Sequence, residues 1–238
     1  MSENEALTQN HPVGVLDAMR KRASMRAFLD RGVSRETVAA ILDAARWAPS
    51  GVNIQPWQVA AVAGEAKRRI GDAIIAAREA DQRRQPDYPY YPEEGFEPDD
   101  GQRKECGLAM YSVLAIGRED TEKRTAAWDR NYRFFDAPVG LLCFLDRNLG
   151  QGAWIDMGMF IQNIMLAGRA FGLATYPQAS PTEYPDIIRG LLGIEPNLAV
   201  VCGIALGYPD IHAPVNDCRT SREPVEAFTC WYERTQKP

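Results

Sequence analysis

The longest apolar stretch of the chain covers residues 153–171 and reads AWIDMGMFIQNIMLAGRAF. Apolar side chains would occupy most of the circumference of a helix formed by this stretch, which predicts a helix buried on nearly all sides. Such a helix belongs at the centre of a domain or in an interface between subunits. Asp156, Gln162, Asn163 and Arg169 interrupt it. It is therefore too polar for a membrane span, and no membrane association is expected.

Buried strands are predicted where short apolar runs surround this helix. Three runs, at residues 57–63, 139–145 and 198–206, read as strands, and a fourth short strand is predicted at residues 172–176. Apolar spacing predicts helices at residues 13–23, 65–80, 103–116, 119–135 and 184–192, and another that begins at Ser34 and stops before Pro49. Helices around three or four central strands indicate a three-layer α+β domain.

Composition restricts the class of protein. The chain has 238 residues, 45% of them hydrophobic, enough for one domain over residues 13–238. Residues 1–12 are polar, lack the features of a signal peptide and read as a flexible tail. The net charge of −5 gives no basic balance for binding nucleic acid. Five cysteines without a CxxC motif fit free thiols in the cytoplasm, and two isolated histidines predict no metal site.

Residues 82–101 form a segment of different composition. Four prolines alternate with aromatic residues there, which fits neither a helix nor a strand. A long aromatic loop in a compact chain is a lid at the rim of an active site or a disordered insert. If it is a lid, its rings stack on a substrate, joined by Phe134 or Phe135. The candidate substrate residues are Tyr88, Tyr90, Tyr91, Phe96 and Phe134.

Two fragments carry paired arginines. Arg22 and Arg26 flank Ser24, and Arg219 and Arg222 lie near the C-terminus. The planar guanidinium group presents a fork of donors that matches a phosphate group. From spacing alone the first pair is equally compatible with a solvated basic face, because Arg20 and Lys21 are adjacent.

Two further fragments are turns of small residues. One runs through residues 48–57 directly after a predicted helix, and the other, residues 176–180, follows a predicted strand. Ligands in sheet proteins often sit at strand ends, where small residues let a flat ring approach the backbone. Each fragment taken singly is also compatible with an ordinary connecting loop.

Taken together, these motifs resemble the FMN-dependent nitroreductase family, in particular its nitrobenzoate and nitroaromatic reductases. The matching stretches are residues 22–28, 48–57, 131–138, 154–175, 200–208 and 219–224. They follow the family's order over most of the chain, which makes the resemblance specific. It implies a nitroreductase-like α-β-α sandwich with a mostly antiparallel central sheet, assembled as an intertwined homodimer with two FMN sites at the interface.

The resemblance also implies roles for individual residues. Arg22 would hold the FMN phosphate, Arg26 would lie at the flavin N1–C2=O edge, and Asn131 would bond the pyrimidine edge. A loop at residues 49–53 would lie against the flavin of the partner subunit. The chain has Gln-Ala-Ser where some relatives carry Glu-Gly, so the backbone donor to flavin N5 is left open. The implied cofactor-binding residues are Arg22, Ala23, Ser24, Arg26, Pro49, Ser50, Gly51, Asn53, Asn131, Pro177, Gln178, Ala179, Arg219 and Arg222.

The implied activity is an NAD(P)H oxidoreductase that reduces a small aromatic acceptor, nitro to nitroso and then hydroxylamine, by ping-pong hydride transfer. No side chain is expected to be catalytic, because the flavin carries the chemistry. A benzoate acceptor would need a cation such as Arg103 nearby. Two alternatives stay open: a reductase of free flavin, quinones or other unsaturated acceptors, and a flavin-binding sensor without turnover.

Overall fold

The computed structural model describes residues 14–91 and 97–233, and within these the side chains of residues 97–100, 102 and 103 are not described. The predicted N-terminal tail at residues 1–12 and the candidate substrate residue Phe96 lie outside the described residues. The same holds for the side chain of Arg103.

The centre of the fold is one antiparallel sheet with the strand order β1-β2-β4-β3. Its strands are β1 (Gln58–Ala63), β2 (Val139–Asp146), β3 (Ala174–Gln178) and β4 (Leu198–Gly207). All ten residues of β4 are buried, as are all of β2 except its last. Burial on both faces explains why these two strands are continuous apolar runs rather than alternating ones.

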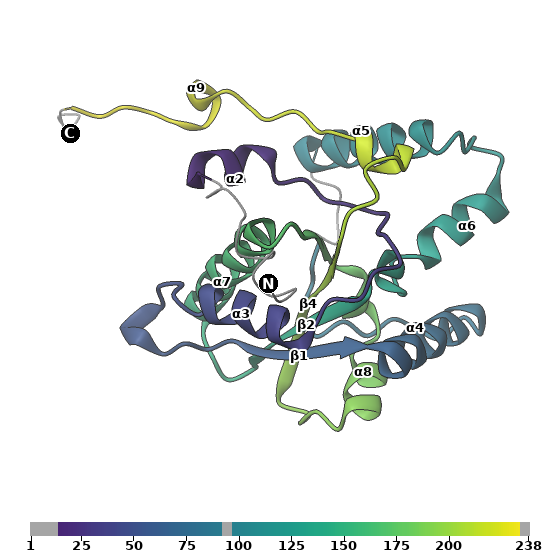
Figure 1. Cartoon of the computed structure of the whole chain (residues 1–238), viewed down its shortest axis with the longest axis horizontal. Helices are drawn as coiled ribbons and strands as arrows, with labels where there is room; N and C mark the ends of the chain where they lie inside the picture. The colour runs from purple at the N-terminus through teal and green to yellow at the C-terminus, as the bar shows by residue number, and fades with distance from the viewer. Residues whose placement is uncertain (1–13, 92–96, 234–238) are drawn as a thin grey trace, which may run out of the picture.

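Helices cover both faces of the sheet, as Figure 1 shows. Helices α3 (Arg35–Ala45) and α7 (Gln151–Ala170) pack on one face, and α4 (Gly64–Glu79) and α8 (Pro185–Leu192) on the other. Alternate residues of β2 point to the two faces: Leu141 joins the core under α7, and Leu142 joins the core under α4. The predicted three-layer α+β arrangement and the antiparallel sheet are confirmed.

Helix α7 is less enclosed than its sequence predicts. Met157, Phe160 and Ile164 are buried, but Ile155 is 69% exposed. The expectation of burial on nearly all sides is therefore wrong for one chain alone. The helix packs on the sheet and on α3 and leaves an apolar side open.

The helical excursion between β1 and β2 differs from the sequence prediction. Helix α5 spans Glu97–Val113, so the loop expected over residues 82–101 ends before Glu97. Pro98 is compatible with this early start, because proline fits the first turn of a helix. Helix α6 spans Thr121–Asp129 and ends before the predicted residue 135. A helix could not continue to residue 135, because Phe134, Phe135 and Asp136 all have a left-handed backbone, with φ of 55°, 51° and 63°.

Strand β3 also lies further along the chain than expected, at Ala174–Gln178 rather than residues 172–176. Pro177 is inside it, paired with Ile204 of β4. Proline is tolerated there because β3 is an edge strand, whose outward backbone groups need no strand partner. The remaining elements are α2 (Val15–Lys21), α9 (Val225–Phe228) and the 3-10 turns η1 (Gly51–Asn53), η2 (Phe134–Asp136), η3 (Ser180–Glu183) and η4 (Pro214–Asp217).

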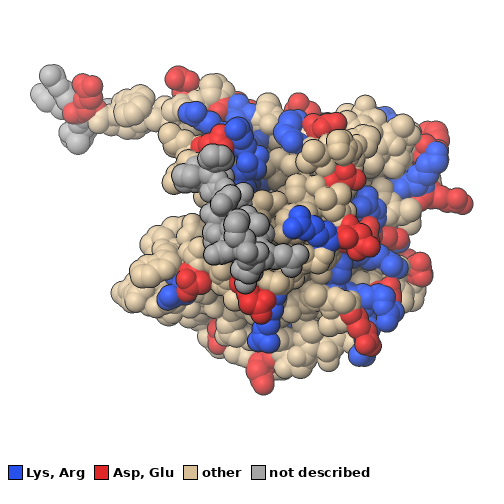
Figure 2. All heavy atoms as spheres, viewed as in Figure 1, with Lys and Arg blue, Asp and Glu red and all other residues tan. Residues whose placement is uncertain are grey.

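The C-terminal segment extends away from the body of the molecule (Figure 1). It carries the exposed rings of Phe228, Trp231 and Tyr232. On the face drawn in Figure 2, acidic and basic side chains are interspersed over the body. Among the described helices none is both long and apolar enough to cross a membrane.

Phe134 is a core residue and not part of an open surface. Its side chain is 1% exposed and packs against Gly140 of β2 and Gly203 of β4. Its expected contact with a substrate would require this ring to leave the core. The packing is tight, because a Cβ atom at Gly140 would lie 2.7 Å from the Phe134 ring.

We predict that Gly140→Ala destabilises the protein by about 1–3 kcal/mol, because the added methyl group overpacks the core against an aromatic ring. The measurement is the free energy of unfolding in urea. Gly190→Ala is the matched control: it lies in α8 with nothing within 4 Å of the added Cβ, so alanine should stabilise by about 0.5–1 kcal/mol. Equal stability of wild type and Gly140→Ala would contradict the proposed packing.

Candidate functional site

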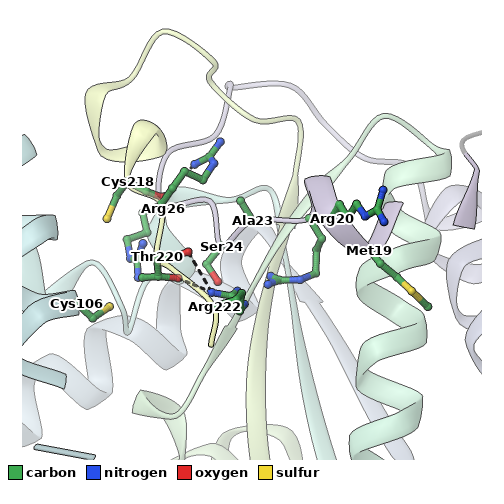
Figure 3. Close-up of a pocket in the computed structure, with 11 residues that line it drawn as sticks. Met19, Arg20, Ala23, Ser24, Arg26, Cys106, Cys218, Thr220 and Arg222 are labelled. Carbon is green, nitrogen blue, oxygen red and sulfur yellow. Dashed lines mark hydrogen bonds between the residues drawn. The ribbon is translucent and has the colours of Figure 1, made fainter. Parts of the chain in front are cut away.

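The predicted arginine fragments meet at one cavity of about 490 Å³, drawn in Figure 3. Its walls come from the end of α2, the segment after it, α5 and the C-terminal segment. We call it the arginine cavity. Its lining residues are Met19, Arg20, Arg22, Ala23, Ser24, Arg26, Cys106, Cys218, Arg219, Thr220 and Arg222.

The segment after α2 is extended, which explains the spacing of its functional residues. Arg22 ends the helix with a β-region backbone, φ −61° and ψ 128°. Ser24 then forms a parallel bridge with Thr175 of β3, and the Met25 N–H donates to the Thr175 carbonyl at 3.2 Å. Alternate residues of an extended chain share a face. Arg22, Ser24 and Arg26 therefore line the cavity together, by strand rather than helical periodicity.

The arginine cavity gathers the positive charge of five arginines. Within the described residues, none of the cavity's five arginines forms an ion pair with Asp or Glu. Burial lowers the pKa of Arg22, and the nearby charges of Arg222 and Arg169 lower it further. Arg222 instead donates to the Thr220 hydroxyl at 2.8 Å (Figure 3), and Arg219 donates to the Asn216 carbonyl at 2.5 Å. Such a cluster suits a bound anion.

A second cavity of about 530 Å³ adjoins the first, because Arg26 and Cys106 line both. We call it the aromatic cavity. Four aromatic side chains contribute to its wall, together with Lys104 and the start of the segment after β3. Its other lining residues are Tyr91, Gly107, Met110, Trp128, Asn131, Phe135, Tyr176, Ala179, Ser180 and Glu183.

Aromatic packing fixes Arg26 where the two cavities meet. The Arg26 guanidinium lies over the Tyr176 ring, 4.7 Å from its centroid. The Phe135 ring packs edge-on against Tyr176 at 4.9 Å. A charge held over an aromatic face is attracted by the ring quadrupole. Arg26 is thus placed to face a ligand that spans both cavities.

The residues expected near a flavin ring have different positions. Asn131 and Ala179 line the aromatic cavity. Gln178 is 3% exposed and lies behind it, where its Nε2 donates to the Asn131 carbonyl at 2.7 Å. Pro177 is held in β3. Gln178 therefore supports Asn131, which its position in the sequence alone did not reveal.

The loop at residues 49–53 does not line either cavity of its own chain. The Gly51 N–H donates to the buried carboxylate of Asp156 in α7 at 3.1 Å, and Asn53 and Val52 have positive φ of 59° and 45°. A β-branched residue such as Val52 rarely adopts this conformation. The loop that contains Pro49 and Ser50 is thus anchored to α7 and lies outside both cavities of its own chain.

Of the aromatic residues expected in the lid-like loop, Tyr91 lines the aromatic cavity, whereas Tyr88 and Tyr90 do not. Tyr91 packs edge-on against Tyr90, with ring centroids 4.9 Å apart. Tyr88 instead donates from its hydroxyl to the Val201 carbonyl at 2.6 Å and packs on Trp154 at 4.5 Å. Burial raises the pKa of Tyr88 well above its ordinary value. Tyr88 serves to fasten the loop.

Asp87 is the second fastening of this loop, and its side chain is only 4% exposed. Its carboxylate accepts from Arg189 at 2.7 Å and from the Val200 N–H at 2.8 Å, and it also pairs with Arg147. Burial alone would raise the pKa of Asp87, but these hydrogen bonds outweigh it and lower the pKa below the ordinary 3.8.

Four site residues lacked a clear signal in the sequence: Trp128, Tyr176, Phe135 as the cavity-lining member of its pair, and Cys106. Tyr176 lies within the small-residue fragment at residues 176–180 and Phe135 within the matching stretch 131–138, but neither motif assigned the side chain to a cavity wall. The others come from the α5–α6 excursion, whose course the sequence did not predict. In the described ranges, no three His, Cys, Asp or Glu side chains are grouped as a metal site requires.

The fold and its two cavities define an α+β protein with an arginine-lined cavity beside an aromatic one. A sequence model described as the nitroreductase family matches residues 19–208. The chain is 38% identical over 214 residues to a nitrobenzene nitroreductase of Ectopseudomonas oleovorans, covering 90% of this chain and 94% of that protein. It is 35% identical over 208 residues to a 4-nitrobenzoate reductase of Pseudomonas putida, covering 87% and 91%.

A solved structure agrees with these sequence matches. The crystal structure of the FMN and NADPH-dependent nitroreductase NfnB from Sphigopyxis sp. strain HMH is similar with a TM-score of 0.88 and 38% identity, covering 93% of this chain and 100% of that one. The chain belongs to the nitroreductase family.

We predict that Asp87→Asn destabilises the protein by about 3 kcal/mol at pH 7, because it removes one partner of a buried ion pair. The folded-state pKa of Asp87 is lowered, so its contribution is complete above the ordinary 3.8 and is lost as pH falls through the folded-state pKa. Urea unfolding of both proteins should show the gap shrinking below about pH 4. A gap of constant size down to pH 3 would contradict this assignment.

Asp43→Asn is the matched control for that experiment. Asp43 pairs with Arg46 on α3, but its side chain is 63% exposed. Solvent screens such a pair, so its loss should change the unfolding free energy by less than about 1 kcal/mol.

Proposed function

We propose that the protein is an FMN-dependent NAD(P)H oxidoreductase that reduces small nitroaromatic compounds. The observation that carries this proposal is the arginine cavity, whose arginines form no ion pair with a described carboxylate, joined through Arg26 to the aromatic cavity. A phosphate attached to a flat ring system fits the two cavities together. Family membership and the names of the nitroaromatic reductases that the chain resembles support the same assignment.

The arginine cavity fits the FMN phosphate by its chemistry. The like charges of Arg22 and Arg222 repel each other. Burial lowers the pKa of Arg22, and the charge of Arg222 lowers it further. A dianionic phosphate would relieve it and accept hydrogen bonds from the guanidinium groups and from the Ser24 hydroxyl. Arg22, Ser24, Arg219 and Arg222 would hold the phosphate, and Ala23 would form part of the same wall.

The aromatic cavity would hold the flavin ring and the acceptor. Arg26 would face the N1 edge and favour negative charge there, and Asn131 would bond the pyrimidine edge. A backbone N–H between Pro177 and Ala179 would face N5. Tyr91 lies where it can stack on an acceptor ring, and Lys104, which lines this cavity together with Arg26, would offer a cation to a benzoate group.

The redox chemistry would come from FMN, which carries two electrons from NAD(P)H to the acceptor in a ping-pong sequence. The chain's own residues bind, orient and tune the cofactor. We expect protons to come from water.

We further propose that the protein acts as a homodimer in which the loop at residues 49–53 meets the partner's flavin. Exposed apolar side chains support this surface. They lie on α7, on α2, just after α3, and in and beside η1. Helix α7 contacts each of the other three elements. The set is Val15, Leu16, Trp47, Val52, Ile54 and Ile155. Contiguous exposed apolar surface is typical of an interaction site. The expected location remains the cytoplasm.

The function is tested by anaerobic reduction of the FMN-loaded protein. NADPH or NADH should bleach the yellow absorbance, and nitrobenzene or 4-nitrobenzoate should restore it while the hydroxylamine accumulates. Failure to bleach with either nicotinamide would contradict an enzyme and favour a flavin-binding sensor. Reoxidation by a quinone but not by a nitroarene would favour the other reductase class.

We predict that Val52→Asp converts the dimer to a monomer, because it places a charge within the exposed apolar surface, at a side chain that is fully exposed in one chain. Analytical ultracentrifugation measures the mass. Leu191→Asp is the matched control, since Leu191 is 37% exposed but lies on α8, in the layer opposite α7. A Val52→Asp protein that sediments as the wild type does would contradict this interface.

A further inference from the structure

Asn216 lies in η4 and is 3% exposed, yet its side-chain amide is fully hydrogen-bonded. Its Oδ1 accepts from the Arg26 N–H at 2.7 Å and from the Ala27 N–H at 3.2 Å. Its Nδ2 donates to the carbonyls of Ala27 and Asp210, each at 2.8 Å. Asn216 does not line the arginine cavity and would not touch a ligand there.

These bonds join the two segments that supply the arginines. On one side Asn216 holds the backbone of Arg26 itself. On the other, its own carbonyl accepts from the Arg219 guanidinium at 2.5 Å, and Arg222 follows three residues later. One residue thus links chain segments 190 positions apart.

Only a short primary amide can satisfy this arrangement. The site requires one acceptor facing two N–H groups and two donors facing two carbonyl groups, which matches the inventory of Asn. Aspartate would place an oxygen against the Ala27 and Asp210 carbonyls. Alanine would leave buried backbone groups without a partner, which is costly.

The link opposes a specific force. Arg22 and Arg222 lie on the two segments and line the same cavity, so their like charges repel. Burial lowers the pKa of Arg22, and the nearby charge of Arg222 lowers it further. Without a phosphate group, repulsion favours separation of the segments. The Asn216 amide fixes their spacing before any ligand arrives, and pre-organisation of this kind increases affinity.

We infer that Asn216 is a positioning residue for the phosphate group of the cofactor, setting the spacing between its N-terminal and C-terminal arginines. The inference rests on the proposed FMN site. The buried Asn216 amide would act on phosphate binding indirectly, through the positions of the arginines, without contacting the phosphate.

The test compares FMN with riboflavin, which has the same ring and ribityl chain but no phosphate group. Dissociation constants are measured by fluorescence quenching on apoprotein of wild type and Asn216→Ala. The variant should bind FMN about tenfold or more weakly, because misplaced guanidinium groups lose their bidentate geometry. Its affinity for riboflavin should change by less than about twofold, because riboflavin has no phosphate group and the Arg26 guanidinium, which would face the ring, is also held over the Tyr176 ring.

Two further variants keep the inference falsifiable. Asn216→Ser retains an acceptor for the Arg26 N–H and should lie between wild type and Asn216→Ala, even if the alanine variant folds poorly. Ile188→Val, at a buried position in α8 remote from the cavity, destabilises by packing alone and should leave both affinities unchanged.

The outcomes separate the inference from the proposed function. Wild type that does not prefer FMN over riboflavin would overturn the phosphate site itself. If wild type prefers FMN, the phosphate site stands. The role of Asn216 would then be overturned by Asn216 variants that keep this preference or that lose affinity for both ligands equally.

Discussion

Repulsion between arginines is the constraint on which the site depends. Five guanidinium groups line one cavity, and the described part of the chain supplies no carboxylate partner for them. Charges of one sign at close range destabilise a fold unless rigid structure holds their segments. The protein tolerates the cost because each segment is tied to the sheet or to a turn beside it. The clustered arginines would favour an anionic ligand, and the restraints on their segments keep the cavity formed when no anion is bound.

The edge of the sheet supplies the main restraint on the N-terminal arginines. Ser24 bridges to Thr175 of β3 in parallel, and further on Phe28 bridges to Pro209, just after β4. The segment between them covers an edge strand, which would otherwise expose its unpaired groups. Its alternate side chains then face away from the sheet and into the cavity. The cavity lies at this edge because the same backbone pairing both closes the edge and aligns Arg22, Ser24 and Arg26.

The sequence predicts the layers of the fold better than the details of the site. Long apolar runs identified β2 and β4, because both strands are buried on both faces, and also α7, whereas helical spacing identified α3. It failed between β1 and β2, where three consecutive left-handed residues end the α6 region and place Phe135, rather than Phe134, on the cavity. Such conformations follow from tertiary packing of Phe134 between two glycines, and no local pattern signals them.

The arginine motifs line one cavity, but their alignment comes from another local geometry than their spacing suggests. Spacing of four suggested one face of a helix end or turn, whereas an extended chain with period two aligns the same side chains. Supporting residues were harder to find. Gln178 and Asn216 act through backbone groups of other segments, and their partners are 47 and up to 190 residues away. Contacts between distant segments leave no periodic trace in a single sequence.

Backbone strain in the loop at residues 49–55 has no function within one chain. Val52 is fully exposed in a conformation unfavourable for a β-branched residue, while Asp156 holds the adjacent Gly51 rigidly. In an isolated chain, a strained backbone that holds the apolar Val52 side chain in water would cost free energy without a compensating contact. An ordered, apolar, anchored loop is instead what an interface between subunits favours, since little conformational freedom remains to be lost on association. The strain therefore supports the proposed homodimer, in which the arginines of one subunit and the strained loop of the other would share a site.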